Sequence, residues 1–126
     1  MFRGEYPDNW PEIAAAVKVA CEATCIRCGH AHDVPSGHVF TVHHFDGDKG
    51  NCRWWNLLGL CQRCHLSVQS RVNPEQPYFF EHSAWLKPYV AGFYAWKYEG
   101  AELSRAEVLA RLEELLAYEC RSEVGA

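Results

Sequence analysis

Two pairs of cysteines constrain the fold of this chain more than any other feature of its sequence. Two residues separate Cys25 from Cys28, and two separate Cys61 from Cys64. This spacing lets both thiolates of a pair reach one ion at about 2.3 Å, and two such pairs complete the tetrahedral shell of a structural Zn²⁺ site. The pattern therefore predicts a closed zinc site built from four cysteines.

The 32 residues between the two pairs exceed the spacing of the simplest zinc ribbons, which is about 15 to 20 residues. Residues 38–43 form a β-rich run, residues 46–51 are rich in turn formers, and residues 56–60 read as a second short strand. Residues 62–72 lack Gly and Pro and can form a helix. We expect a β-hairpin followed by a helix, with one cysteine pair at the base of each arm.

A second set of residues stands in register with the cysteines. The pair His43-His44 lies between them, and the run from Asn56 to His65 reads Asn-Leu-Leu-Gly-Leu-Cys-Gln-Arg-Cys-His. Together these residues resemble the HNH nuclease family, whose pattern is C-x-x-C, a D/H-H pair, and N-L-x-x-L-C-x-x-C-H. The match covers about a third of the chain. It implies an α+β fold with a treble-clef-like ββα-metal core over residues 25–72, a four-cysteine zinc site, an N-terminal helix and C-terminal helices.

The resemblance also implies a role for each polar residue of the motif. His44 matches the general base, and His43 matches the first ligand of a catalytic ion, a position often held by Asp. His65 matches the second ligand, and Asn56 matches the residue that holds the hairpin loop. The catalytic ion would be Mg²⁺, Mn²⁺, Ni²⁺ or Zn²⁺, separate from the structural zinc. The implied activity is that of an endonuclease that hydrolyses phosphodiester bonds of DNA.

The residue types suit this chemistry. Histidine can act as a ligand or a base near neutral pH, because its unperturbed pKa is about 6.5. Two consecutive histidines at a strand end point in different directions, so that one can face a metal and the other the attacking water. The alternative is that the pair is structural, since a His-His pair taken alone is more often so. The family pattern is broken in the loop at residues 51–55, where Trp54 and Trp55 could contact DNA or cover the core.

Length and composition predict one globular domain over residues 1–126, because 48% of the residues are apolar and 22% are charged. No signal peptide opens the chain, so we expect a cytoplasmic protein in which paired cysteines bind metal and do not form disulfides. The remaining cysteines, Cys21, Cys52 and Cys120, are expected to be free thiols. No apolar run is long enough to span a bilayer, so no membrane partner is expected.

The net charge of −4 argues against a nucleic-acid partner, because proteins that bind nucleic acids usually carry a basic face. The acidity, however, is concentrated in residues 97–126, whereas residues 43–71 carry four basic and two acidic side chains. The basic residues are candidates for phosphate contacts: Lys49, Arg53, Arg63 and Arg71. DNA remains the predicted partner. The alternative function is a non-catalytic zinc module that binds nucleic acid or protein.

Helices are predicted on both sides of the motif. Pro11 precedes a helix over residues 12–20, and aromatic residues recur at helical intervals over residues 88–98, up to Gly100. These aromatic side chains could stack on bases, but at this spacing they more often line a core. We expect residues 78–120 to form a helical extension packed on the core.

Ser104 and Glu107 form a capping-box pattern that begins a last helix. Its apolar face carries five residues: Val108, Leu109, Leu112, Leu115 and Leu116. Glu107 and Arg111 are spaced for an ion pair on another face. The apolar face is expected to pack on the aromatic helix, with a homodimer through the C-terminal helices as the alternative.

Overall fold

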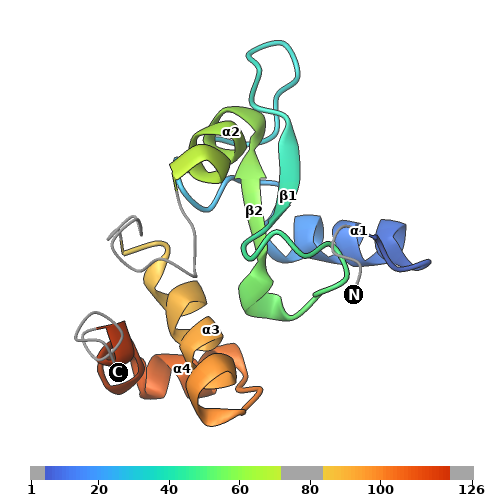
Figure 1. The fold of residues 1–126 in the computed structure, drawn as a ribbon. Helices are drawn as coiled ribbons and strands as arrows, with labels where there is room; N and C mark the ends of the chain where they lie inside the picture. Colours follow the sequence, from blue (N-terminus) through green and yellow to red (C-terminus); the bar gives the residue numbers. More distant parts are fainter. Residues whose placement is uncertain (1–4, 72–83, 120–126) are drawn as a thin grey trace. The chain divides into compact units, whose positions relative to one another are not determined.

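The computed structural model describes residues 5–71 and 84–119 of the chain. These fall into two compact units, residues 1–71 and residues 72–126, and each is described by itself. The fold mixes helices with a small two-stranded sheet (Figure 1). Within the described ranges, no helix combines the length and the apolar character needed to cross a membrane.

The first unit contains the strand–strand–helix order expected from the sequence. Its elements are α1 (Trp10–Ala20), β1 (Phe40–His44), the 3-10 helix η1 (Trp54–Asn56), β2 (Leu57–Cys61) and α2 (Gln62–Arg71). The strands pair antiparallel, with Phe40 opposite Cys61 and His44 opposite Leu57. Figure 1 shows α2 continuing directly from β2. The predicted hairpin and helix are confirmed, with strand boundaries displaced by one or two residues.

The side chains of β1 alternate between two faces of the hairpin, as the pleat requires. His44 meets α1, because its ring lies 4.8 Å from the ring of Trp10. Thr41 and His43 meet α2, because both lie against His65 in its first turn. The hairpin therefore holds consecutive residues of β1 against two different helices.

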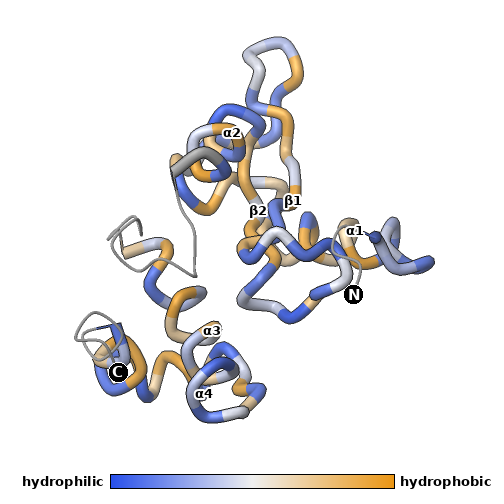
Figure 2. The backbone as a smooth tube through the Cα atoms, viewed as in Figure 1, coloured by the Kyte–Doolittle hydropathy of each residue, from blue (hydrophilic) through white to orange (hydrophobic). Residues whose placement is uncertain are grey.

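Strand β2 is buried at all five of its positions, and Figure 2 shows it mostly in the hydrophobic colours, whereas the loop that joins the strands is mostly hydrophilic. Gly59 lies at its centre. A Cβ atom there would lie 2.6 Å from Cζ of Phe40 and 2.8 Å from Sγ of Cys21. Such distances are far inside van der Waals contact, so the close packing of these two side chains requires glycine.

The second unit consists of α3 (Lys87–Glu99), α4 (Arg105–Ala110) and α5 (Leu112–Leu116). Every residue of α3 from Pro88 to Ala95 is buried. Both shorter helices pack on α3 and bury Val108 and Leu115 completely. The expected packing of the last apolar residues on the aromatic helix is confirmed. Gly100 ends α3 with a left-handed φ of +65°, as glycine commonly does after a helix.

One prediction for this unit is wrong. The last helix is not continuous, because Arg111 leaves the helical region at φ −119° and ψ 23° and separates α4 from α5. Ser104 and Glu107 do form the predicted capping box. Glu107 is therefore engaged at the helix start and does not pair with Arg111.

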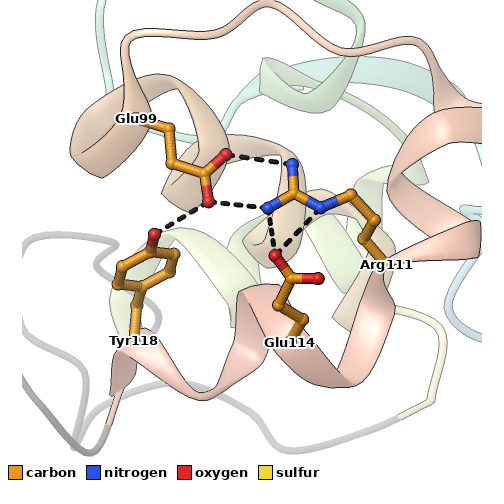
Figure 3. A network of polar contacts seen from close by, with 4 residues as sticks. All are labelled: Glu99, Arg111, Glu114 and Tyr118. Carbon is orange, nitrogen blue, oxygen red and sulfur yellow. Dashed lines mark hydrogen bonds and ion pairs between the residues drawn. The ribbon is translucent and has the colours of Figure 1, made fainter.

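Arg111 instead belongs to a polar network with Glu99, Glu114 and Tyr118, which Figure 3 shows. Its Nη1 and Nη2 atoms donate to the two carboxylate oxygens of Glu99 at 3.0 and 2.8 Å, and its Nε atom donates to Glu114 at 3.1 Å. The hydroxyl of Tyr118 donates to Glu99 at 2.8 Å. A two-pronged contact of this kind is stronger than an exposed pair along one helix, which explains why the break at residue 111 is favoured.

The organisation of the whole chain as one domain, with residues 78–120 packed on the core, stays a prediction. Residues 78–83 and residue 120 lie outside the described part of the chain. Cys120 and the aromatic residues at positions 78–80 belong to these segments.

Candidate functional site

Four cysteine thiols form one cluster in the first unit. The sulfur atoms of Cys25, Cys28, Cys61 and Cys64 all lie within 4.8 Å of one another. Cys28 is exposed and the other three are buried. In the described ranges, no other group of three or more His, Cys, Asp or Glu side chains lies close enough together to hold an ion. The predicted convergence of the two cysteine pairs is confirmed.

Each cysteine pair forms a knuckle in which a backbone amide points at a sulfur. The amide of Cys28 donates to Sγ of Cys25 at 3.4 Å, and the amide of Cys64 donates to Sγ of Cys61 at 3.4 Å. Gly29 follows the first pair with a φ of +78°, a left-handed conformation that glycine adopts without steric cost. Such amides stabilise negative charge on the sulfur they face.

The first knuckle is also joined to the hairpin and to the second knuckle. The amide of Ile26 donates to the carbonyl oxygen of Gly59 at 2.9 Å, which attaches the knuckle to β2. The guanidinium of Arg27 donates to Sγ of Cys64 at 3.5 Å. Two short pairs that are distant in the sequence are therefore held together by contacts other than the sulfurs themselves.

The arrangement of the sulfurs fits a tetrahedral ion. Sulfurs at about 2.3 Å from a central Zn²⁺ lie about 3.8 Å from one another, and Sγ of Cys28 lies 3.8 Å from Sγ of Cys61. Four thiolates with no carboxylate or water are the ligand set of a structural zinc site. The four cysteines are placed to bind a metal ion, consistent with the zinc expected from the sequence.

The thiols of this cluster differ in acidity. Burial opposes ionisation of Cys25, but the backbone amides of Cys28, Cys61 and Arg27 outweigh it and lower the pKa of Cys25 to about 7. Burial raises the pKa of Cys64 to about 12. Because metal ions bind thiolates, binding to this cluster must displace protons and become weaker as the pH falls.

Two histidines, one on β1 and one in α2, lie against each other. The ring centroids of His43 and His65 are 4.9 Å apart. Burial, together with the nearby His65, lowers the pKa of His43 to about 4, and burial also lowers the pKa of His65. Both imidazoles are therefore neutral near pH 7, which is the form that can bind a metal. Two imidazoles can supply part of a coordination shell and leave positions open to water or phosphate.

A hydrogen bond to Thr41 determines which nitrogen of His65 can bind an ion. The hydroxyl of Thr41 has one proton, which it donates to the carbonyl oxygen of Leu60 at 2.9 Å. Its oxygen also lies 2.9 Å from Nδ1 of His65, so Nδ1 is the donor in that contact. The lone pair of the ring is then on Nε2. Such second partners orient the histidine ligands of metal sites.

His44, the predicted general base, lies on the opposite face of β1. Its ring packs 4.8 Å from that of Trp10 and 5.8 Å from that of Tyr6. The side chain is 6% exposed, and its buried Nε2 atom has no hydrogen-bond partner among the residues that the structure describes. Burial lowers the pKa of His44, although Asp46 and Asp48 oppose this effect. His43 and His65 are thus brought together, whereas His44 points away toward α1.

Asn56 anchors the loop that follows His44. It is fully buried, and its amide group donates to Oδ1 of Asp46 at 2.9 Å and to the carbonyl oxygen of Asn51 at 2.8 Å. Its side-chain oxygen accepts from the amide of Asp46 at 2.8 Å. Asn51 adds a bond from its amide group to Oδ2 of Asp46 at 2.8 Å. The side chain of Asn56 therefore fixes both ends of this loop.

Three of the four candidate phosphate contacts interact within the unit: Lys49, Arg53 and Arg63. The ammonium of Lys49 lies 4.9 Å from the centre of the Tyr6 ring. Arg53 donates to Oδ1 of Asn51 at 3.0 Å, and Arg63 donates to the carbonyl oxygen of Ser36 at 3.2 Å. Arg71 is the last residue of α2, and its side chain lies outside the described part of the structure.

Sequence reasoning missed the residues that surround the histidines. Tyr6 and Trp10 cover His44, and no motif or period connects them with it. Thr41 could have been found, because it stands two positions before His43 and two-residue spacing puts both side chains on one face of a strand.

Comparisons with known proteins give one partial similarity. Over 60 residues, the chain is 33% identical to Zorya protein ZorE from Escherichia coli (strain ATCC 8739). The matching stretch covers 48% of this chain and 16% of that protein, so the chain spans about a sixth of the length of this curated relative. No family model matches the chain, and no solved structure matches it.

Proposed function

We propose that this protein is a zinc-stabilised, metal-dependent DNA endonuclease of the HNH type. The observation that carries the proposal is the approach of His43 and His65 to 4.9 Å at the junction of a hairpin and a helix that also holds a four-cysteine cluster. The histidine pair and two of the four cysteines, Cys61 and Cys64, lie on one strand–strand–helix unit, as the resemblance to that family implies.

In this proposal each residue has a separate task. Nε2 of His65 and the ring of His43 would hold a divalent cation, and Thr41 keeps His65 in the tautomer that has its lone pair on Nε2. A bound cation would neutralise charge on the scissile phosphate and on the leaving oxygen. His44 accepts a proton from water, for which its neutral form is required. Asn56 holds the loop after His44 and so keeps the backbone of that residue in place.

A second candidate function is a zinc module without catalytic activity. One observation favours it: His44 is 6% exposed behind Tyr6 and Trp10. A general base must come within hydrogen-bond reach of water, so these rings have to move before His44 can act. In the non-catalytic reading, His44 is a core residue of the contact between α1 and the hairpin.

Nicking of supercoiled plasmid tests the two candidates. Wild-type protein is incubated with Mg²⁺, Mn²⁺, Ni²⁺ or Zn²⁺ in turn, beside His44→Ala and His43→Ala. His30→Ala is the matched control, because His30 is an exposed histidine of the same unit outside both clusters. We expect wild type and His30→Ala to nick DNA equally, and both other variants to lose the activity. Equal, background-level nicking by all four proteins with every ion would favour the non-catalytic module.

A further inference from the structure

An open cavity of about 420 Å³ lies between α1 and β1 in the first unit. This volume is in the range of about 300–1,000 Å³ that is usual for small-ligand sites. Helix α1 lines the cavity with Trp10, Ala14, Ala15 and Lys18, and the side chains of the two alanines end at Cβ and leave space between the larger ones. Val42 and Phe40 form part of the opposite wall. A run of small helix residues facing a strand thus creates room for a flat group.

Aromatic rings line the cavity. Tyr6 and Trp10 both line it, with ring centroids 5.1 Å apart and planes inclined by 32°. Tyr6 is 50% exposed, although burying its ring would be favourable. An exposed aromatic ring in a concave site can stack on the face of any base, and such stacking tolerates differences of sequence.

The remaining lining residues are polar: Lys18, Thr41 and His65. His65, a candidate ligand of the catalytic cation, borders the cavity together with Thr41. Lys18, in the last turn of α1, contributes an exposed positive charge to the lining. A nucleotide next to the scissile phosphate has the complementary pattern of a flat apolar base joined to negative phosphates.

We propose that this cavity binds one unpaired nucleobase of the DNA substrate, and that the protein therefore prefers single-stranded or locally unpaired DNA to a regular duplex. The base stacks on Trp10 and Tyr6, the adjoining phosphate contacts Lys18, and the chain continues toward His65. A paired base within a duplex is stacked on its neighbours and has to be extruded before it can enter such a site. This inference rests on the proposed function, since it names the substrate of the same site.

Binding can be measured separately from cleavage. Fluorescence anisotropy is recorded with a labelled short oligodeoxythymidine, single-stranded or annealed to its complement, and no divalent cation is added. We expect wild-type protein to bind the single strand at least about fivefold more tightly than the duplex. Trp10→Ala should weaken binding of the single strand by at least about fivefold, because stacking on one ring is lost, and should change duplex binding little.

A second variant guards against a folding effect of Trp10→Ala. Ala15→Leu fills the cavity without removing any contact and keeps a good helix former in α1. It should lower the affinity for the single strand to that for the duplex. Val19→Ala is the matched control on the same helix, because Val19 is 78% exposed and does not line the cavity. Zinc content and far-ultraviolet circular dichroism establish that each variant is folded.

Equal affinity of wild type for the two forms of DNA would overturn the inference. So would full single-strand binding by folded Trp10→Ala and Ala15→Leu. Its failure can be distinguished from failure of the proposed function. If the protein prefers single-stranded DNA but cleaves DNA with no metal, the proposed nuclease function is wrong and the proposed base-binding cavity is supported. If it nicks DNA with a metal but shows no such preference, the nuclease function is supported and the base-binding cavity is wrong.

Discussion

The hydroxyl oxygen of Thr41 lies 2.9 Å from Nδ1 of His65, and the same hydroxyl donates to the carbonyl oxygen of Leu60. One side chain of β1 thus connects β2 with the first turn of α2. The contact leaves Nε2 of His65 as the nitrogen with the lone pair. Residues on three elements therefore decide the orientation of one imidazole. This contact gives a direct test of the proposed cation site at His43 and His65.

Thr41→Val keeps the shape and the β-branch of the side chain but removes the acceptor for His65 Nδ1–H. We expect the affinity of the His43–His65 pair for Mn²⁺ or Ni²⁺ to fall by about 10–100-fold, as is usual when the outer partner of a metal-binding histidine is lost. Isothermal titration calorimetry of zinc-loaded protein measures this affinity. Thr41→Ser retains the hydroxyl and should bind like wild type. Equal affinity of the valine variant would show that the hydrogen bond does not orient a ligand.

Cys61→Ser should remove zinc from the four-cysteine cluster and unfold the first unit. Structural zinc contributes on the order of 10 kcal/mol to the folding of small domains, and Cys61 is 1% exposed at the end of β2. Elemental analysis should give about one zinc per chain for wild type and none for the variant. Cys52→Ser is the matched control, since Cys52 is a free cysteine outside the cluster. A folded, zinc-free Cys61→Ser protein would contradict the structural role of the ion.

Gly59→Ala should destabilise the hairpin by about 1–3 kcal/mol, the usual cost of inserting a methyl group into a packed core. The added Cβ would lie 2.6 Å from Cζ of Phe40 and 2.8 Å from Sγ of Cys21. Urea unfolding measures the loss. Phe40→Leu shortens the side chain nearest to the added methyl group. Gly59→Ala should therefore destabilise the Phe40→Leu protein less than it destabilises wild type. Simple additivity of the two changes would exclude the proposed clash.

The stability of the first unit should fall as the pH is lowered from about 6.5 toward 4. The folded protein binds a proton on His43 only near pH 4, because burial and His65 lower the pKa of that imidazole. In the unfolded chain His43 binds this proton near pH 6.5, so between about pH 6.5 and 4 the unfolded state holds more protons than the folded state. Lowering the pH in this window therefore favours unfolding. The effect of this one group reaches about 3 kcal/mol at the acidic end.

Acid also protonates the cysteine ligands, so the comparison must be made with a variant. His43→Gln removes the titrating group and leaves the cluster unchanged. Urea unfolding at a series of pH values, without added divalent cation, should show a steeper loss for wild type than for His43→Gln between pH about 6.5 and 4. Parallel pH profiles of the two proteins would mean that His43 is not buried as a neutral imidazole.

Local patterns predicted the local parts of this structure well. A two-residue cysteine spacing, a capping box at Ser104 and a glycine after a helix each act within one turn of the chain, and all three appear in the structure as expected. The helix expected to continue through Arg111 does not, because a two-pronged contact with Glu99, twelve residues away, competes with regular helix geometry there. A short window of sequence around Arg111 does not include Glu99, so local patterns could not predict this break.

The sequence alone determined which residues could act as ligands and that a hairpin separates the two knuckles, because residue identity and short spacing decide both. Only the tertiary structure decided that His43 faces His65 while His44 is enclosed by Tyr6 and Trp10. The pleat sends consecutive histidines to opposite faces, but which helix covers each face depends on how distant segments pack. The cavity beside His65 exists for the same reason: small residues of α1 happen to meet β1 only once the chain has folded.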